Sequence, residues 1–334
     1  MTSELYSINY HNRDLKEYSF LITGGAGFIG SNIVEYLVHH NAGKIRVLDN
    51  LSNGYLDNIK EFLDLPNFEF INGDIRDFET CRKAVEGMHY ISHQAALGSV
   101  PRSINDPILT NEVNVSGFLN MLTATKDEPS VKKMVYAASS STYGDSPLLP
   151  KKEEIIGKPL SPYAVTKLVN ELYADVFSKV YGCHTIGLRY FNVFGPKQNP
   201  DNPYAAVIPL FIKSAIEKKA PRIYGDGETS RDFTFVENVV QANIKALLID
   251  SQKKHTVFNI ACGKQTTLNF LWQIISQSYG SEDIVPEFLP ERDGDIKHSL
   301  ADISKAKSIL SYNPLFSVED GLISLKKVTN IIKI

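Results

Sequence analysis

Cysteine is scarce in this chain of 334 residues, which contains only three. Cys81, Cys183 and Cys262 lack the paired spacing that disulfide frameworks and zinc sites need. We therefore expect free thiols, most simply buried ones, in a protein of a reducing compartment, namely the cytoplasm. The sequence predicts no metal site.

Long apolar runs and blocks of like charge are also missing. No run approaches the length of a membrane span, and the polar N-terminus lacks the apolar centre of a signal peptide. Lys and Arg number 35 against 38 Asp and Glu, and basic residues form pairs, as at 132–133, but no longer block. We therefore expect neither a membrane nor a nucleic acid as a partner.

The chain does contain an alternation of short apolar runs and helical patterns. This alternation is typical of a doubly wound parallel sheet, a Rossmann-type α/β fold with helices on both faces. The expected strands are 19–23, 44–49, 68–72, 90–96, 133–139 and 183–189, and the expected helices between them are 28–40, 57–64, 78–86, 105–126 and 163–181.

The pattern loosens after Tyr190. Turns rich in Gly and Pro then separate the helices expected at 205–219, 236–249, 267–279 and 317–331. We interpret residues 1–17 as an N-terminal extension without a readable function and residues 18–190 as a dinucleotide-binding Rossmann domain. Residues 191–334 are interpreted as mainly a smaller C-terminal lobe that binds the substrate, with a soft boundary.

A glycine-rich turn follows the first expected strand directly, in the segment FLITGGAGFIGSNIVEYLV. Gly24, Gly27 and Gly30 lie where the strand turns into a helix, and side chains there would keep a phosphate away from the backbone N–H groups. The helix N-terminus would add its positive pole. Asp49 ends the second strand, nineteen residues after Gly30, where a carboxylate can accept hydrogen bonds from ribose hydroxyls and repel a 2′-phosphate. The spacing favours NAD over NADP, although Asp49 alone could be a turn residue.

The segment SPYAVTK places a phenol, Tyr163, and an amine, Lys167, four residues apart near the start of a helix. The apolar stripe that follows, from Val165 to Tyr181, leaves both on the side away from its centre. This side faces either water or a cofactor. A neighbouring ammonium favours the phenolate and lowers the pKa of a phenol from about 10, so the pair could remove a hydroxyl proton beside NAD⁺.

A hydroxyl that could orient the reacting oxygen ends an earlier strand, in YAASSSTYG. Together with the glycine turn and the Tyr–Lys pair, it resembles the extended short-chain dehydrogenase/reductases over residues 19–324, which also carry segments like GDIRD, HQAA, NEVNVSG and LRYFNVFGP. The resemblance implies a catalytic set of Ser139, Tyr163 and Lys167. It also implies cofactor contacts from Gly24, Gly27, Phe28, Ile29, Gly30, Asp49, Asn50, Ser52, Asn53, Gly54, Asp74, Ile75, Gln94, Ala95, Ala96, Asn114, Tyr163, Lys167, Tyr190 and Val193.

A nucleotide-sugar site is implied by the same resemblance. Arg231 and Arg292 would clamp a diphosphate, a task that suits the guanidinium fork, and Asp295 would take a ribose or uracil group. Without the motif, either arginine would more simply form a surface ion pair. The implied substrate residues are Gly98, Ser99, Ser139, Ser140, Ser141, Asn192, Ala206, Val207, Tyr224, Arg231, Arg292, Asp295 and Ser299.

The residues after Ser139 help to distinguish between the reactions that this superfamily catalyses. Nucleotide-sugar dehydratases and decarboxylases of this superfamily carry a carboxylate before the YG pair, whereas this chain has Ser140, Ser141 and Thr142. Hydroxyls cannot replace a carboxylate as the base for a carbon-bound proton. The resemblance therefore implies 4-epimerisation, in which C4 of the sugar is oxidised transiently and reduced from the other face, and NAD is regenerated.

The segments AALGSVPRSINDP, SPYAVTKLVNELYADVFS, YAAVIP and HSLADISKA resemble the bacterial UDP-N-acetylhexosamine 4-epimerases most closely. A small residue at Ser299, and Gly98 in place of a lysine, would admit an acetamido group at C2, although Ser299 could be an ordinary turn residue. C6 could carry a hydroxymethyl or a carboxylate.

The alternatives to this function are a UDP-glucose 4-epimerase, a dehydratase or decarboxylase, and a non-catalytic NAD-sensing module. The helices at 165–181 and 108–122 suggest a homodimer.

Overall fold

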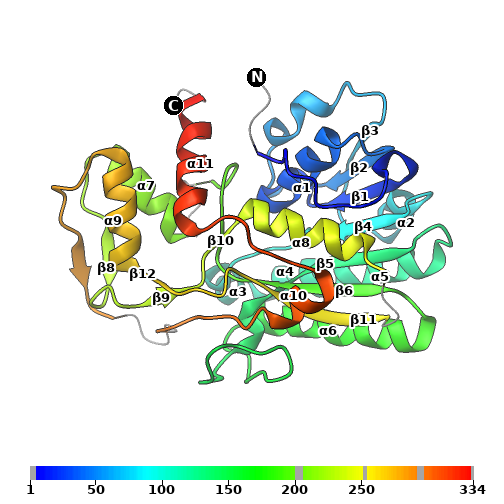
Figure 1. Cartoon of the computed structure of the whole chain (residues 1–334). Helices are drawn as coiled ribbons and strands as arrows, with labels where there is room; N and C mark the ends of the chain where they lie inside the picture. The colour runs from blue at the N-terminus through cyan, green and yellow to red at the C-terminus, as the bar shows by residue number, and fades with distance from the viewer. Residues whose placement is uncertain (1–4, 200–205, 251–253, 292–296, 332–334) are drawn as a thin grey trace.

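The computed structural model describes residues 5–199, 206–250, 254–291 and 297–331. Its centre is a sheet of seven parallel strands in the order β11-β6-β5-β4-β1-β2-β3 (Figure 1). The order reverses between β1 and β4, which opens a crevice at the carboxyl ends of the strands. The strands are β1 (Ser19–Thr23), β2 (Lys44–Asp49), β3 (Phe68–Asn72), β4 (Tyr90–His93), β5 (Lys133–Ser139), β6 (Thr185–Tyr190) and β11 (His255–Ile260).

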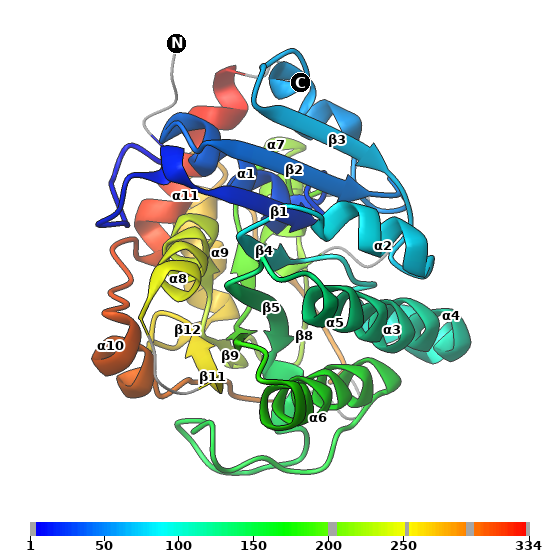
Figure 2. The same cartoon turned by 90° about the vertical axis from the view of Figure 1, so that its right-hand side faces the viewer.

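Helices cover both faces of this sheet, which confirms the predicted Rossmann-type fold (Figure 2). All residues of β1 and β6 are buried, as expected for continuous apolar strands between two helical layers. Leu21 packs with one core and its neighbour Ile22 with the other, because successive side chains leave a strand on opposite faces. The helices are α1 (Phe28–His39) and α8 (Val236–Leu248) on one face, and α2 (Phe78–Val85), α5 (Phe118–Asp127) and α6 (Pro162–Tyr181) on the other.

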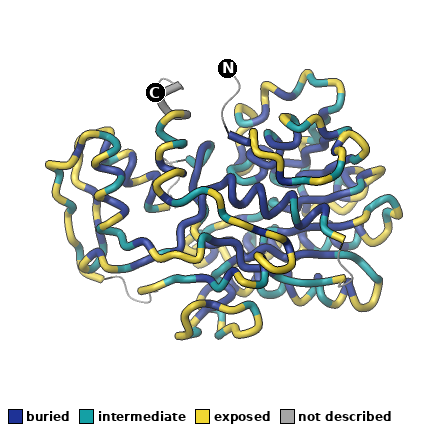
Figure 3. The backbone as a smooth tube through the Cα atoms, viewed as in Figure 1, coloured by how far each residue is buried: buried dark blue, intermediate teal, exposed yellow. Residues whose placement is uncertain are grey.

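The sheet is not confined to residues 18–190. Its edge strand β11 comes from residues 255–260, and α8 covers a face of the sheet, so the chain returns to the Rossmann layer after entering the second lobe. Figure 3 shows α8 buried along its length at the centre of the molecule.

The second lobe contains short strand pairs and three longer helices. Paired there are β7 (Val193–Phe194) with β10 (Thr234–Phe235), β9 (Ser230–Arg231) with β12 (Thr266–Thr267), and β8 (Arg222–Tyr224) with β13 (Glu287–Leu289). The helices are α7 (Val207–Ile216), α9 (Leu268–Tyr279) and α11 (Val318–Ile331), and a shorter helix, α10 (Ser304–Leu310), packs near β11.

The helix predicted at 105–126 corresponds to α4 (Pro107–Asn111), a π-helical turn η4 (Glu112–Gly117) and α5, which follow one another directly. A separate short helix, α3 (Val100–Asn105), precedes them. Pro107 lacks the N–H that would continue α3, and Asp106 caps the new helix by accepting a hydrogen bond from Leu109 N at 3.0 Å. The helix predicted at 57–64 is a pair of 3₁₀ turns, η2 (Leu56–Asn58) and η3 (Lys60–Phe62).

The segment before β1, which includes the 3₁₀ turn η1 (Leu15–Glu17), packs on α1 and α8. Tyr6 and Leu15 are buried, and the ring of Tyr10 stacks on that of Tyr36 in α1. The Tyr10 hydroxyl donates to Glu237 Oε1 of α8 at 3.0 Å. The N-terminal extension is thus part of the helical layer from residue 5 onward.

Candidate active site

A cavity of about 520 Å³ lies at the carboxyl ends of the central strands. The glycine turn after β1, Asp49 at the end of β2 and Gln94 after β4 line one part of it. Ser139 at the end of β5 and Tyr163 near the start of α6 line another. Parallel strands direct their carboxyl-end loops to one edge, which is why these distant segments meet.

The glycine turn forms a cradle at this cavity. Gly24 has a φ of +66°, which favours glycine, and a side chain on Gly30 would overlap the carbonyl oxygen of Gly24. Gly27 is the N-cap of α1, so the first N–H groups of the helix lie beside the cavity-lining residues Phe28 and Ile29. This cradle fits a diphosphate, which binds to unpaired N–H groups at a helix N-terminus.

Asp49 is held in one orientation behind the glycine turn. Its carboxylate accepts hydrogen bonds from Ala26 N at 2.9 Å and Leu51 N at 2.8 Å. Burial raises the pKa of Asp49, and these backbone hydrogen bonds oppose the rise. The carboxylate is thus fixed at the cavity wall, where a ribose would lie in a dinucleotide of this family.

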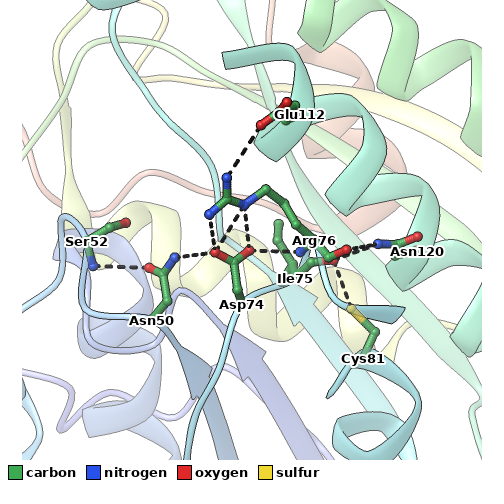
Figure 4. Close-up of polar contacts among 8 residues, drawn as sticks. All are labelled: Asn50, Ser52, Asp74, Ile75, Arg76, Cys81, Glu112 and Asn120. Carbon is green, nitrogen blue, oxygen red and sulfur yellow. Dashed lines mark hydrogen bonds and ion pairs between the residues drawn. The ribbon is translucent and has the colours of Figure 1, made fainter. Parts of the chain in front are cut away.

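Figure 4 shows a second acidic side chain, Asp74, between Asn50 and Arg76. Asn50 Nδ2 donates to Asp74 Oδ2 at 2.9 Å, and the Arg76 guanidinium donates to both carboxylate oxygens at 2.8 and 3.1 Å. The hydrogen bond from Arg76 is the main reason that the pKa of Asp74 falls to about 2. Arg76 also reaches Glu112 Oε2 of η4 at 3.5 Å, so it links the cavity wall to that turn.

The backbone of Ile75, which lines the cavity, is fixed from behind (Figure 4). The Cys81 thiol donates to the Ile75 carbonyl oxygen at 3.1 Å, and Asn120 Nδ2 donates to the same oxygen at 3.0 Å. Burial raises the pKa of Cys81 to about 12. Cys81 is therefore a structural thiol that helps to shape the wall.

Tyr163 and Lys167 line the cavity from the first turns of α6. Ser161 caps this helix by accepting a hydrogen bond from Ala164 N at 3.2 Å, and Tyr163 N donates to Ser103 Oγ of α3 at 3.0 Å. Lys167 Nζ donates to the Ala137 carbonyl oxygen of β5 at 2.8 Å and lies 5.9 Å from the centre of the Tyr163 ring. The sheet and α3 thus fix the pair beside Ser139.

Burial shifts the pKa values of both members of this pair. Burial raises the pKa of Tyr163, and a hydrogen bond with Ser139 only partly opposes the rise. Burial also lowers the pKa of Lys167 to about 8. In the chain without a cofactor, desolvation of Tyr163 therefore outweighs the hydrogen bond with Ser139. That Lys167 and bound NAD⁺ together favour the phenolate stays a prediction.

Nearly all residues predicted to contact the cofactor line the cavity. They are Gly24, Gly27, Phe28, Ile29, Gly30, Asp49, Asn50, Ser52, Asn53, Gly54, Asp74, Ile75, Gln94, Ala95, Ala96, Tyr163, Lys167, Tyr190 and Val193. Asn114 lies behind the wall instead, where it accepts a hydrogen bond from Leu97 N at 2.8 Å and donates to Thr166 Oγ1 at 3.1 Å.

The residues predicted to bind the substrate are divided between two regions. Gly98, Ser99, Ser139, Ser140, Asn192 and Ala206 line the cavity, whereas Ser141, Val207, Tyr224, Arg231 and Ser299 do not. Arg231 donates to the carbonyl oxygens of Ser230 and Lys297 at 3.0 and 3.3 Å, and Ser299 N donates to Ser230 O at 3.1 Å. Arg292 and Asp295 lie outside the described residues.

Several polar residues line the cavity although they were not predicted from the sequence as site residues. They are Tyr55, Asn58, Arg102, Lys197, Gln198 and Asn199. Arg102 Nη1 donates to Asn53 Oδ1 at 2.7 Å, which links α3 to the loop after β2. Lys197 Nζ donates to Glu35 Oε2 of α1 at 2.8 Å. Their position in loops after expected strands was the available signal, because such loops converge at one edge of the sheet.

Two features are absent from the described part of the chain. None of its helices is both long and apolar enough to cross a membrane. It also contains no cluster of three or more His, Cys, Asp or Glu side chains arranged to hold a metal ion.

Comparisons with known proteins agree with this site. The family model "NAD dependent epimerase/dehydratase family" matches residues 20–261. A putative UDP-glucose 4-epimerase of Methanocaldococcus jannaschii is 37% identical over 315 residues, which cover 94% of this chain and 98% of that protein. A UDP-N-acetylglucosamine 4-epimerase from Methanobrevibacter ruminantium, solved in complex with UDP-N-acetylmuramic acid, has 40% identity and a TM-score of 0.88, covering 94% of this chain and 99% of that one.

A third relative was solved with its cofactor. The UDP-glucuronic acid 4-epimerase from Bacillus cereus, in complex with UDP-glucuronic acid and NAD, has 29% identity and a TM-score of 0.85, covering 94% of this chain and 99% of that one. The three relatives act on different UDP-sugars according to their names, but they share the family and the fold. The chain therefore belongs to the NAD-dependent epimerase/dehydratase family of the short-chain dehydrogenase/reductase superfamily, alongside UDP-sugar 4-epimerases, and NAD is its cofactor.

Proposed function

We propose that the chain is a UDP-N-acetylhexosamine 4-epimerase that interconverts UDP-GlcNAc and UDP-GalNAc, or the corresponding uronic acids, for surface polysaccharide precursors. The observation that carries this proposal is the meeting of Ser139, Tyr163 and Lys167 in the same cavity as the glycine cradle. A base and a hydroxyl beside a bound NAD are what transient oxidation of a sugar hydroxyl requires.

Each of the three residues has a distinct role in the proposal. Ser139 Oγ holds the 4-oxygen of the sugar, and Tyr163 removes and later returns its proton. Lys167, held by the Ala137 carbonyl at 2.8 Å, supplies positive charge near the phenol. NAD bound in this cavity would supply the hydride acceptor and donor for C4, and its oxidised ring would add a positive charge that favours the phenolate of Tyr163.

The acidic residues of the cavity support epimerisation over dehydration or decarboxylation. Among the described lining residues, carboxylates come only from Asp49, which ends β2, and Asp74, which follows β3, and neither lies at the end of β5. The 3₁₀ turn η5 (Ser140–Tyr143) after Ser139 offers hydroxyls, and Thr142 Oγ1 donates to the Ser139 carbonyl at 2.8 Å. No carboxylate at the end of β5 is therefore available among these residues to remove a carbon-bound proton.

Space beside the proposed sugar site favours a substituent at C2. A Cβ added at Gly98 would meet no atom within 4 Å, and Gly98 and Ala206 both line the cavity. The relative from Methanobrevibacter ruminantium, an N-acetylglucosamine enzyme by name, supports the same choice. Ser299 is proposed to border the C2 substituent, and Arg231 and Arg292 to hold the diphosphate. The relatives named for UDP-glucose and UDP-glucuronic acid make these sugars the second candidates.

We also propose that the chain forms a homodimer through α6. This helix turns its polar residues Thr166, Lys167 and Glu171 inward and leaves a stripe of apolar residues exposed, with Leu172 at 58% and Val180 at 65%. The neighbouring helix α4 adds Ile108, which is 73% exposed. A contiguous apolar face of this kind is typical of a protein interface, and a second copy of the same face would complement it.

The substrate proposal is tested by incubating the purified protein with UDP-GlcNAc, UDP-glucose and UDP-GlcNAcA and separating the products by chromatography. We expect the 4-epimer of an N-acetylated sugar to form about tenfold or more faster than UDP-galactose. Turnover of UDP-glucose alone would contradict the acetamido assignment. Accumulation of a keto sugar or of NADH would indicate a dehydratase or reductase, and NAD binding without turnover would indicate a sensing module.

A further inference from the structure

A buried polar network lies directly behind the wall of the cofactor cavity. Its centre is Asn243 of α8, which is 0% exposed and does not itself line the cavity. It contacts Gln94 and Tyr190, which do line it, and Ser92 of β4, which is 1% exposed. Helix α8 packs on β4, β5 and β6 (Figure 1). Asn243 therefore contacts Ser92 of β4 and Tyr190 of β6 at once.

The hydrogen bonds of Asn243 fix the direction of its own amide. Nδ2 donates to the Val239 carbonyl at 2.8 Å and to the Tyr190 hydroxyl at 2.9 Å. Oδ1 faces the Ser92 hydroxyl at 3.2 Å and Gln94 Nε2 at 3.1 Å, both of which can donate to it. Each polar atom of Asn243 therefore has partners that suit its chemistry in this one orientation.

The same network fixes the amide of Gln94. Both N–H bonds of its Nε2 are directed into the protein, toward Asn243 Oδ1 at 3.1 Å and Ser92 Oγ at 3.0 Å. Tyr190, which accepts a hydrogen bond from Asn243 Nδ2, has two acceptors within reach of its own proton, Gln94 Oε1 at 3.2 Å and Asn243 Oδ1 at 3.3 Å. Since Asn243 Oδ1 already faces two donors, we assign this proton to Gln94 Oε1. A carbonyl oxygen has two lone pairs, so Oε1 keeps one acceptor site, whereas Nε2 has no donor left.

We propose that Asn243 is a positioning residue for the cofactor, which holds Gln94 so that it presents an amide oxygen, and not an amide N–H, to bound NAD. The dinucleotide offers matching donors in its ribose hydroxyls and its carboxamide. The same contact holds the Tyr190 ring at the cavity wall. Loss of Asn243 would leave Gln94 Nε2 and the Tyr190 hydroxyl short of partners and free Gln94 to rotate, which weakens the binding of NAD.

The test compares Asn243→Ala with a matched control on the same helix, Asn238→Ala. Asn238 is also 0% exposed, but its side chain donates to Phe316 O at 2.8 Å and accepts from Phe316 N at 3.2 Å, away from the cavity. Both variants lose a buried amide, so both should lower the melting temperature. Titration of the cofactor-free proteins with NAD by calorimetry should show about a tenfold higher Kd for Asn243→Ala and less than about a twofold change for Asn238→Ala.

A double-mutant cycle with Gln94→Met tests whether Asn243 acts through Gln94. In the Gln94→Met background, Asn243→Ala should change the Kd for NAD far less than in the wild type, because the positioned amide is already gone. Equal Kd values for the two asparagine variants, or additive effects in the cycle, would overturn the proposal. If Asn243→Ala does not fold, the Kd for NAD is measured with Ser92→Ala instead. A rise of about threefold in this Kd supports the proposal, and an unchanged Kd contradicts it.

Discussion

Burial disfavours the charged forms of both Tyr163 and Lys167. It raises the pKa of the phenol and lowers that of the ammonium to about 8, so each group is shifted toward its neutral form. Without a second positive charge nearby, the buried site thus favours the neutral phenol, so a cationic cofactor ring beside Tyr163 would be needed to favour the phenolate. The sequence could identify both residues, but it could not show this balance, because desolvation depends on the sheet packed beneath α6.

Lys167 should make the stability of the protein depend on pH in a defined direction. The folded protein binds this proton less tightly than the unfolded chain, so the contribution of Lys167 to the free energy of unfolding increases as the pH rises from about 8 to about 10.5. The difference in stability between wild type and Lys167→Met, measured by urea unfolding, should rise by up to about 3 kcal/mol over this range. Lys179→Met, on the exposed end of α6, controls for the loss of a lysine. A difference that does not vary with pH would contradict the assignment.

Tyr163→Phe should separate cofactor binding from chemistry. The ring that lines the cavity is retained, but the hydroxyl that moves the proton is lost, so NAD should still bind while turnover falls by about 10²–10⁴-fold. Steady-state rates and NAD content of the purified variant are the two measurements. Tyr181→Phe, an exposed tyrosine on the same helix, should leave both unchanged. Wild-type turnover by Tyr163→Phe would rule out the proposed base.

At the scale of elements, α6 shows what the sequence could and could not predict. The predicted helix at 163–181 matches α6 closely, because Ser161 and Pro162 mark its start and Gly182, with a φ of +76°, ends it. Periodicity alone could not show which of the two faces of α6 packs on the sheet. An apolar stripe is normally buried, yet here the polar face packs on the sheet because it carries Lys167 and the Glu171–Arg189 ion pair.

The exposed face of α6 predicts a change of assembly on substitution. Leu172→Glu combined with Val180→Glu places two charges on the apolar face and should convert a dimer to monomers in light scattering, with NAD binding retained. Ile216→Glu, at a 42% exposed isoleucine of α7, is the control and should keep the dimer. A wild-type monomer, or a double variant that stays dimeric, would contradict the proposed interface.

The start of α1 gives a prediction about packing. A Cβ at Gly30 would overlap the Gly24 carbonyl oxygen, so Gly30→Ala must displace the glycine turn. We expect a loss of about 1–3 kcal/mol in the free energy of unfolding and weaker NAD binding. Gly98→Ala, where a Cβ meets nothing within 4 Å, should leave stability unchanged. Denaturant unfolding of both variants is the measurement, and equal stabilities would argue against the close packing of Gly30.

At the scale of the whole molecule, sequence patterns identified the layers better than the connections between them. The six strands expected before residue 190 are all present, because each is a short apolar run between helical patterns. The return of β11 to the sheet and the contact of Asn243 with Gln94, 149 positions earlier, were not predictable, since neither leaves a local periodicity. The burial of Tyr6 and Tyr10 against α1 and α8 likewise depends on long-range packing.

We propose that the whole molecule acts to invert C4 of a UDP-N-acetylhexosamine by oxidising and then reducing the same carbon. The most direct test supplies UDP-GlcNAc that carries deuterium at C4 of the sugar and follows the product by mass spectrometry and NMR. We expect UDP-GalNAc that retains deuterium at C4, without net reduction of NAD. Loss of the deuterium to solvent, release of a keto sugar, or the absence of conversion would contradict it.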